Sequence, residues 1–159
     1  MMSGPTADGG PVPGLELEVP PKPAFVRTAR HAVAALARLH EAPEDLVEDI
    51  KLAVSEACNP AVARTEAGPD SATDPLTIVA AVNAGRIEIE VFDPNGKVAR
   101  EVTGAPADID TQDLPFDRVL ALPIVRGLVD EVAITQESGG ARMRMLVALT
   151  PATESPASS

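Results

Sequence analysis

Apolar residues recur at helical spacing in two long stretches of the first half of the chain. The first stretch runs from Ala24 to about His40, and its apolar positions are Val26, Ala29, Val33, Leu36 and Ala37 or His40. The second runs from Asp45 to Thr65, and its apolar positions are Leu46, Ile50, Ala53, Val54, Ala57, Ala61 and Val62. Because residues three and four apart share one helical face, the pattern predicts two amphipathic helices.

Alternation of apolar and polar residues predicts strands in the rest of the chain. The clearest strand is Arg86–Phe92, in which every second residue is Ile or Val. Further strands are predicted over 15–19, 76–82, 132–135 and 142–149, and a third helix over about 119–129. Each strand has one polar face. We therefore predict an α+β fold, a two-layer α/β sandwich whose mixed, mainly antiparallel sheet is covered by helices on one face.

The domain boundaries follow from the distribution of glycine and proline. Residues 1–14 and 150–159 lack any hydrophobic period, and we expect both to be disordered tails. Residues 15–149 are expected to form one domain, which is the default for a chain of 159 residues. Residues 98–117 are acidic and contain Pro and Gly, so they are expected to form a long loop that is either a mobile lid or disordered.

Composition excludes several classes of function. The formal net charge of −11 argues against direct nucleic-acid binding, and it fits either a partner with a basic surface or simply solubility. The single cysteine, Cys58, excludes an intramolecular disulfide and is expected to be a small buried residue. His31 and His40 have no partners at metal-binding spacing. No apolar run is long enough to span a membrane and no signal pattern is present, so we expect a cytoplasmic protein.

Glu56 and Pro60 interrupt the apolar pattern of the second helix. The proline ring and its missing N–H oppose the helical hydrogen bond to the carbonyl of Glu56. A helix that loosens beside an acidic side chain could form part of a site. Alternatively, Glu56 is solvated and Pro60 marks an early end of the helix, which is the commoner situation for acidic helical residues.

Four segments together resemble the motifs of a known family. They are Leu52–Cys58 (LAVSEAC), Val91–Gly96 (VFDPNG), Leu122–Val132 (LPIVRGLVDEV) and Gly139–Met145 (GGARMRM). They are similar to motifs of the bacterial anti-sigma factor serine kinases of the GHKL, or histidine kinase-like ATPase, superfamily. The resemblance extends over roughly residues 15–149, is nearest to divergent actinobacterial members, and implies the Bergerat-type ATPase fold.

The first motif of this family implies roles for residues of the second helix. In the family a Glu acts as general base, and an Asn four residues later holds magnesium. Glu56 matches the base, but Pro60 occupies the Asn position and Asn59 lies one residue before it. One residue turns a side chain by about 100° around a helix, so Asn59 could replace the magnesium ligand only if Pro60 distorts the backbone.

The other two motifs imply a nucleotide site. In the family an Asp binds the adenine amino group and is followed by glycines. Asp93 matches this Asp, whereas Asn95 and Lys97 occupy the glycine positions. Gly96 lies between them and is the remaining glycine that the resemblance assigns to the nucleotide. The family's third motif is a glycine-rich lid that binds phosphates, but the corresponding residues 116–121 contain no glycine. Binding of ATP and magnesium is therefore implied by the resemblance and predicted to be weak or lost.

Two functions follow from the resemblance. The first is an anti-sigma factor-like regulator of transcription that binds a sigma factor or an anti-anti-sigma (STAS-type) antagonist and has a degenerate ATP site. The second is an active ATP-dependent serine protein kinase that phosphorylates the antagonist. The family implies a partner surface on the first helix, where Arg27, Arg30 and Arg38 are candidates that we expect to be exposed, and a possible homodimer. Alternatively, these arginines only pair with the acidic second helix.

Overall fold

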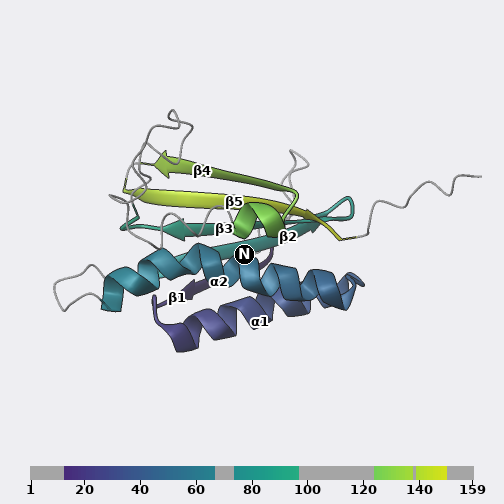
Figure 1. Ribbon diagram of the computed structural model, residues 1–159, viewed down its shortest axis with the longest axis horizontal. Helices are drawn as coiled ribbons and strands as arrows, with labels where there is room; N and C mark the ends of the chain where they lie inside the picture. The colour runs from purple at the N-terminus through teal and green to yellow at the C-terminus, as the bar shows by residue number, and fades with distance from the viewer. Residues whose placement is uncertain (1–12, 67–73, 97–123, 138, 150–159) are drawn as a thin grey trace, which may run out of the picture.

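The computed structural model describes residues 13–66, 74–96, 124–137 and 139–149, and all structural statements below concern these residues. The secondary-structure elements are β1 (Pro13–Val19), α1 (Pro23–Leu39), α2 (Glu44–Glu66), β2 (Leu76–Asn83), β3 (Arg86–Asp93), β4 (Glu131–Glu137) and β5 (Gly140–Ala148) (Figure 1). A short helical turn at 124–128 precedes β4. The α+β prediction is confirmed, and the predicted strands and both long helices agree with the structure to within a few residues. The predicted loop 98–117, residues 119–123 of the predicted third helix and most of the two predicted tails lie outside the described residues.

The five strands form one sheet in the order β1-β2-β3-β5-β4. All four strand pairings are antiparallel. The turn of the β2–β3 hairpin has positive φ angles of 54° at Ala84 and 78° at Gly85. A tight hairpin turn requires this backbone conformation, and the predicted Asn83-Ala84-Gly85 turn is where it occurs.

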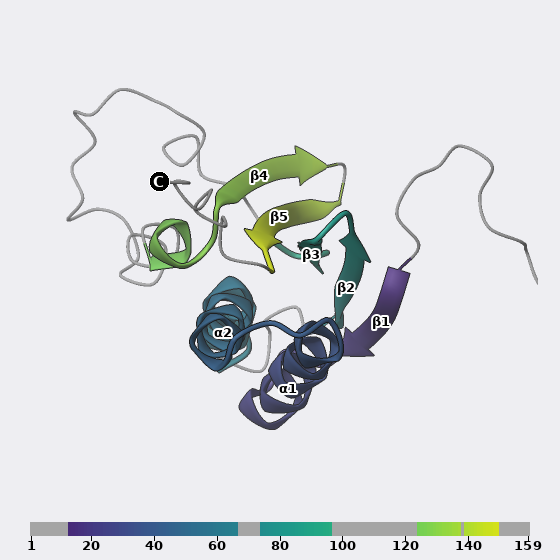
Figure 2. The same ribbon diagram turned by 90° about the vertical axis from the view of Figure 1, so that its right-hand side faces the viewer.

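Both long helices lie on the same side of the sheet, and the short helical turn lies beside α2 on that side (Figure 2). The predicted core face of α1 is confirmed, because Val26, Ala29, Val33, Leu36 and Ala37 are all buried. His40 is exposed. On the sheet, Ile87, Ile89, Val91, Met145 and Val147 are buried on the side that faces the helices, as alternation predicted.

The buried face of α2 is rotated slightly from the one predicted. Val47 and Cys58 are fully buried, whereas Leu46 and Ala57 are only partly buried against the core. The expectation that Cys58 is a small buried residue is confirmed. Pro60 lies inside α2, so the expectation of an early helix end at Pro60 is wrong. Ala61 and Val62 are buried beyond it, and their packing offsets the one helical hydrogen bond that Pro60 cannot donate.

The open face of the sheet carries a network of ion pairs. Arg144 Nε lies 2.7 Å from Glu88 Oε1, and Arg142 lies 2.8 Å from Glu137 and 3.7 Å from Glu90. The guanidinium of Arg142 also lies 4.9 Å from the centre of the Phe92 ring. Glu88 and Glu90 are consequently half-buried rather than fully solvated. These contacts join neighbouring strands on the face that no helix covers.

None of the described helices is both long and apolar enough to cross a membrane.

Candidate functional site

The end of β3 and the C-terminal half of α2 meet at an ion pair between Asp93 and Arg64. One guanidinium nitrogen of Arg64, Nη2, donates to Asp93 Oδ1 at 2.8 Å and to Oδ2 at 2.9 Å. The side chain of Asp93 is only 14% exposed and that of Arg64 is 27% exposed. A charge-assisted contact at this depth is stronger than a surface ion pair. Asp93, which the family resemblance identified as the adenine-binding Asp, is therefore already paired with the guanidinium of Arg64.

The turn after β3 is held by its own hydrogen bonds. The backbone N–H of Asn95 donates to Asp93 Oδ1 at 3.0 Å, and that of Gly96 donates to the Asp93 carbonyl at 3.0 Å. The Asn95 side chain bonds both the N–H and the carboxylate of Asp74. These contacts hold the Asp93 carboxylate in an orientation that faces α2.

Two glycines let this turn pack closely against the start of β5. A Cβ atom at Gly140 would lie 2.4 Å from the Asp93 carbonyl oxygen and 2.8 Å from Cα of Pro94. A Cβ at Gly96 would lie 3.0 Å from the Cβ of Ala141 and 3.0 Å from Asp93 Oδ2. At Gly140 the neighbouring backbone therefore excludes any side chain larger than hydrogen, whereas at Gly96 the side chains of Asp93 and Ala141 would have to shift. Gly96, which the family resemblance assigned to the nucleotide, has a structural role in this packing.

Glu56 and Asn59 lie side by side on the opposite side of α2 from the core. The Asn59 side-chain N–H donates to Glu56 Oε2 at 3.3 Å, and Asn59 is exposed. Pro60, partly buried, occupies the next position of the helix. The structure thus places the candidate base and the candidate magnesium ligand in contact with each other. The described residues contain no group of three or more His, Cys, Asp or Glu side chains that could hold a metal ion.

Cys58 lies on the buried side of α2, close enough to Asp93 for its charge to act on the thiol. Burial raises the pKa of the Cys58 thiol to about 12, and the negative charge of Asp93 contributes to the same shift. The thiol is fully buried. It is therefore un-ionised and unreactive at neutral pH, and its role is in packing.

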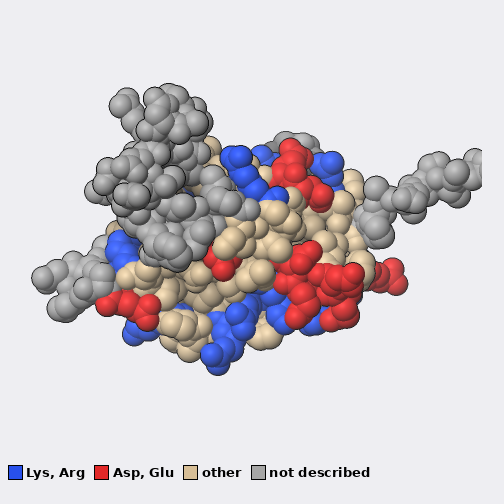
Figure 3. Space-filling model, viewed as in Figure 1, with Lys and Arg blue, Asp and Glu red and all other residues tan. Residues whose placement is uncertain are grey.

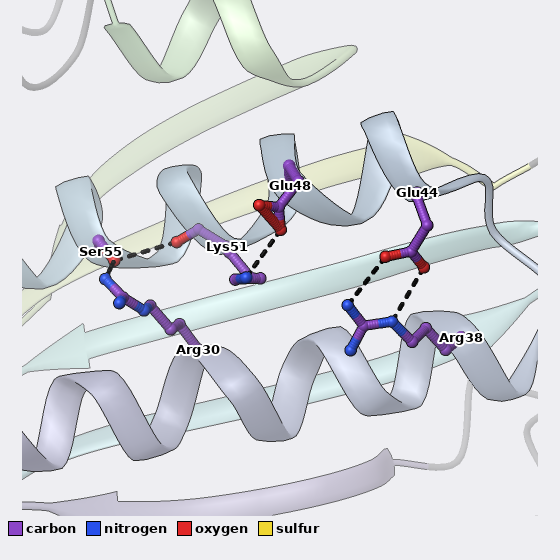
Figure 4. Close-up of polar contacts among 6 residues, drawn as sticks. All are labelled: Arg30, Arg38, Glu44, Glu48, Lys51 and Ser55. Carbon is purple, nitrogen blue, oxygen red and sulfur yellow. Dashed lines mark hydrogen bonds and ion pairs between the residues drawn. The ribbon is translucent and has the colours of Figure 1, made fainter.

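Charged residues of both signs lie on the outer surface of the two helices, basic ones on α1 and mainly acidic ones on α2 (Figure 3). Acidic side chains gather at the end where α2 begins, with Glu44 and Asp45 in its first turn. Arg38 on α1 binds Glu44 through two hydrogen bonds of 3.0 Å (Figure 4). The hydrogen bond from Arg38 lowers the pKa of Glu44. One of the three candidate partner arginines therefore pairs with the acidic helix.

The other two candidate arginines differ from each other in exposure. Arg30 was expected to be exposed, but it is partly buried between the helices, where Nη1 donates to the Ser55 hydroxyl at 3.3 Å (Figure 4). Its Nε is buried and has no partner among the described residues. Arg27 is exposed and forms no ion pair with the described part of the chain. Arg27 is thus the most accessible of the three.

Arg64 is the residue of this site that the sequence did not identify. It is separated from Asp93 by 29 positions, and no local pattern pairs the two. The one available signal was its position eight residues after Glu56, two helical turns further along the same helix. The predicted lid residues 116–121 and Lys97 lie outside the described residues.

A model of the family described as "Histidine kinase-like ATPase domain" matches residues 19–147. The chain therefore belongs to the histidine kinase-like ATPase family. Within it, the chain is 31% identical over 129 residues to the serine-protein kinase RsbW of Bacillus pumilus, covering 79% of this chain and 80% of that protein. RsbW of Bacillus subtilis is 29% identical, with 79% of each chain covered. The resemblance to the anti-sigma factor serine kinases is confirmed.

Two solved structures share the fold. The RsbU and RsbW domains of Rv1364c from Mycobacterium tuberculosis match with a TM-score of 0.62 at 19% identity, over 87% of this chain and 32% of that one. The SiaB–SiaC complex of Pseudomonas aeruginosa matches with a TM-score of 0.61 at 14% identity, over 85% and 89%. At such identities the likeness concerns the fold alone.

The buried Cys58 thiol predicts a specific dependence of stability on pH. In the unfolded chain a cysteine has a pKa near 8.5, whereas in the folded chain that of Cys58 is about 12. Its contribution to stability is fully present below the unfolded pKa and is lost as the pH rises toward 12. The free energy of unfolding should therefore fall by about 1.4 kcal/mol per pH unit above pH 9, relative to Cys58→Ala. Urea unfolding of both proteins between pH 8 and 11 measures this, and parallel curves would contradict it.

Proposed function

We propose that this chain is an anti-sigma factor-like regulator of transcription that acts in the cytoplasm, binds a sigma factor or an anti-anti-sigma (STAS-type) antagonist, and has a degenerate ATP site. The observation that carries the proposal is the ion pair of Arg64 with both oxygens of Asp93. In the family, the corresponding Asp binds the adenine amino group. An amino group would have to compete here with a guanidinium that is already held at 2.8 Å.

The residues around Glu56 support the same conclusion. Magnesium is bound by oxygen atoms in near-octahedral geometry, so the site needs a well-placed protein ligand beside the phosphates. Pro60 has no side-chain oxygen, and Asn59 is exposed with its amide directed to Glu56. If ATP and magnesium bound, Asp93 and Asn59 would hold them, and the metal would neutralise charge on the phosphates during phosphoryl transfer. The ion pair of Arg64 with Asp93 and the proline at position 60 both oppose that arrangement.

The family relationship supports the choice of partners, and the surface supports their chemistry. The chain carries a net charge of −11, which favours a partner with a basic surface. Arg27 lies on α1, a helix that contains no acidic residue, and it is exposed and unpaired among the described residues. An arginine in this situation can bind a carboxylate of the partner without first breaking an internal ion pair. Arg38 would have to release Glu44 to do so.

Partner binding tests this proposal directly. A purified sigma factor or STAS-type antagonist from the same genome should bind the full chain at micromolar concentration without added nucleotide, as measured by calorimetry. Arg27→Glu should weaken binding about tenfold, because it replaces an interfacial attraction by a repulsion. Arg86→Glu is the matched control, because Arg86 is an exposed arginine beside the turn of the β2–β3 hairpin and not on α1. Absence of binding to either class of partner, or equal losses in the two variants, would contradict the proposal.

The second candidate function is a serine protein kinase that phosphorylates the antagonist. It is favoured by one observation, the contact between Glu56 and Asn59. In that reaction Glu56 would accept the proton of the antagonist's serine hydroxyl, whose oxygen attacks the γ-phosphorus of ATP while ADP leaves. Asn59 would replace the missing magnesium ligand.

A phosphorylation assay distinguishes the two functions. With labelled ATP, magnesium and a purified antagonist, we expect no more transfer by the natural chain than by Glu56→Ala. Pro60→Asn restores the family's magnesium ligand and serves as the comparison for a repaired site. Transfer by the natural chain that depends on Glu56 would make the kinase the correct function.

A further inference from the structure

The two edges of the sheet differ in how well they are protected against pairing with another strand. At one edge, the register of β1 with β2 shifts between Pro13 and Leu15. Pro20 follows the strand directly, and Glu16 and Glu18 are exposed along it. Prolines, register irregularities and exposed charges are the means by which proteins prevent edge-to-edge association. The edge formed by β1 is therefore protected.

The opposite edge, formed by β4, has neither a proline nor a shift in register, and its charged residues lie only at its two ends. All seven residues of β4 pair with β5 in one uninterrupted register, from Glu131 opposite Leu146 to Glu137 opposite Gly140. The strand contains no proline and no basic residue. Four consecutive residues of the strand are uncharged and β-branched or small, and all four are partly or fully exposed: Val132, Ala133, Ile134 and Thr135. Figure 2 shows β4 at the margin of the sheet, on the far side of β5 from the other strands.

An edge strand can form main-chain hydrogen bonds with a further strand on its outer side. In an antiparallel pair, alternate residues direct their N–H and C=O groups toward the neighbouring strand and the remaining residues direct theirs away from it. No described strand lies on the outer side of β4. A regular edge with no bulge or proline can accept a further strand over Val132–Thr135, where main-chain hydrogen bonds then supply affinity.

The charges at the two ends of β4 indicate what kind of strand fits. Glu131 and Glu137 are its only charged residues. They contact Arg86 at 3.8 Å and Arg142 at 2.8 Å, but their side chains remain 64% and 41% exposed. Each carboxylate can therefore accept a second cation. A second copy of β4 paired antiparallel about Ile134 would instead place Glu131 opposite Glu137 at both ends, and opposed like charges destabilise a strand pair.

We propose that the outer edge of β4 is a β-addition site for an extended segment of a partner protein, in which β-branched or small residues are flanked on both sides by Lys or Arg. The acidic ends of β4 set the position of the segment, and the uncharged centre tolerates its variable residues. This site is on a different element from the partner surface of α1. It can therefore exist whether or not the chain binds a sigma factor.

A labelled probe peptide, acetyl-Lys-Val-Thr-Val-Thr-Val-Lys-amide, tests the proposal on the full chain. Fluorescence anisotropy should show binding about tenfold tighter than for the same peptide with Glu at both ends, because two attractions replace two repulsions. Amide chemical-shift changes should occur in 131–137 and not in β1. The Lys-ended peptide with Pro at its centre should bind more weakly, because the proline removes a main-chain donor.

A charge reversal in the protein completes the test. Glu131→Lys with Glu137→Lys should reverse the preference, so that the Glu-ended peptide binds tighter than the Lys-ended one. Circular dichroism verifies that this variant is folded, and the peptide comparison on the natural chain does not depend on it. Equal affinity for the two peptides, shifts at β1, or sedimentation showing that β4 is occupied by a second copy would overturn the proposal.

Discussion

The packing of α2 against the sheet is the interaction on which both the core and the site depend. Ile50, Val54, Cys58, Ala61 and Val62 are buried along one side of this helix. They are mostly small, so the helix can lie close to the sheet. The same rotation of the helix directs Glu56 and Asn59 away from the core and brings Arg64 to Asp93. A shift of one residue would turn every one of these side chains by about 100° and break the ion pair together with the core.

Much of the fold could be predicted from the sequence because each strand alternates and each helix has one apolar face. The site was predictable only where a family motif supplied the residue, as for Glu56 and Asp93. Arg64 was not found, since its contact with Asp93 joins residues 29 positions apart. The partial burial of Arg30 was missed for the same reason, because it depends on Ser55 of the other helix. The effect of Pro60 was misjudged because tertiary packing of Ala61 and Val62 outweighed a local rule.

The same residues that hold the turn after β3 also explain how the ATP site could be lost while the fold is retained. Gly96 and Gly140 allow this turn to pack closely on β5. Asp93 accepts hydrogen bonds from the Arg64 side chain and from the backbone N–H groups of its own turn, including that of Asn95. These contacts are internal and require no nucleotide. An RsbW-like domain of this kind can therefore keep a rigid surface for protein partners without phosphoryl transfer. The outer surface of the two helices and the regular edge of β4 are the two surfaces that we propose for protein partners, and they lie on different elements.

We propose that Arg64 takes the place of the nucleotide as the partner of Asp93. Calorimetric titration of the natural chain with magnesium and ATP is the decisive experiment. We expect no saturable binding at millimolar nucleotide and no increase in stability, whereas a ligand at a hundred times its dissociation constant would add about 2.7 kcal/mol. Saturable binding by the natural chain that is lost in Asp93→Ala would show instead that the Asp93 carboxylate still binds adenine.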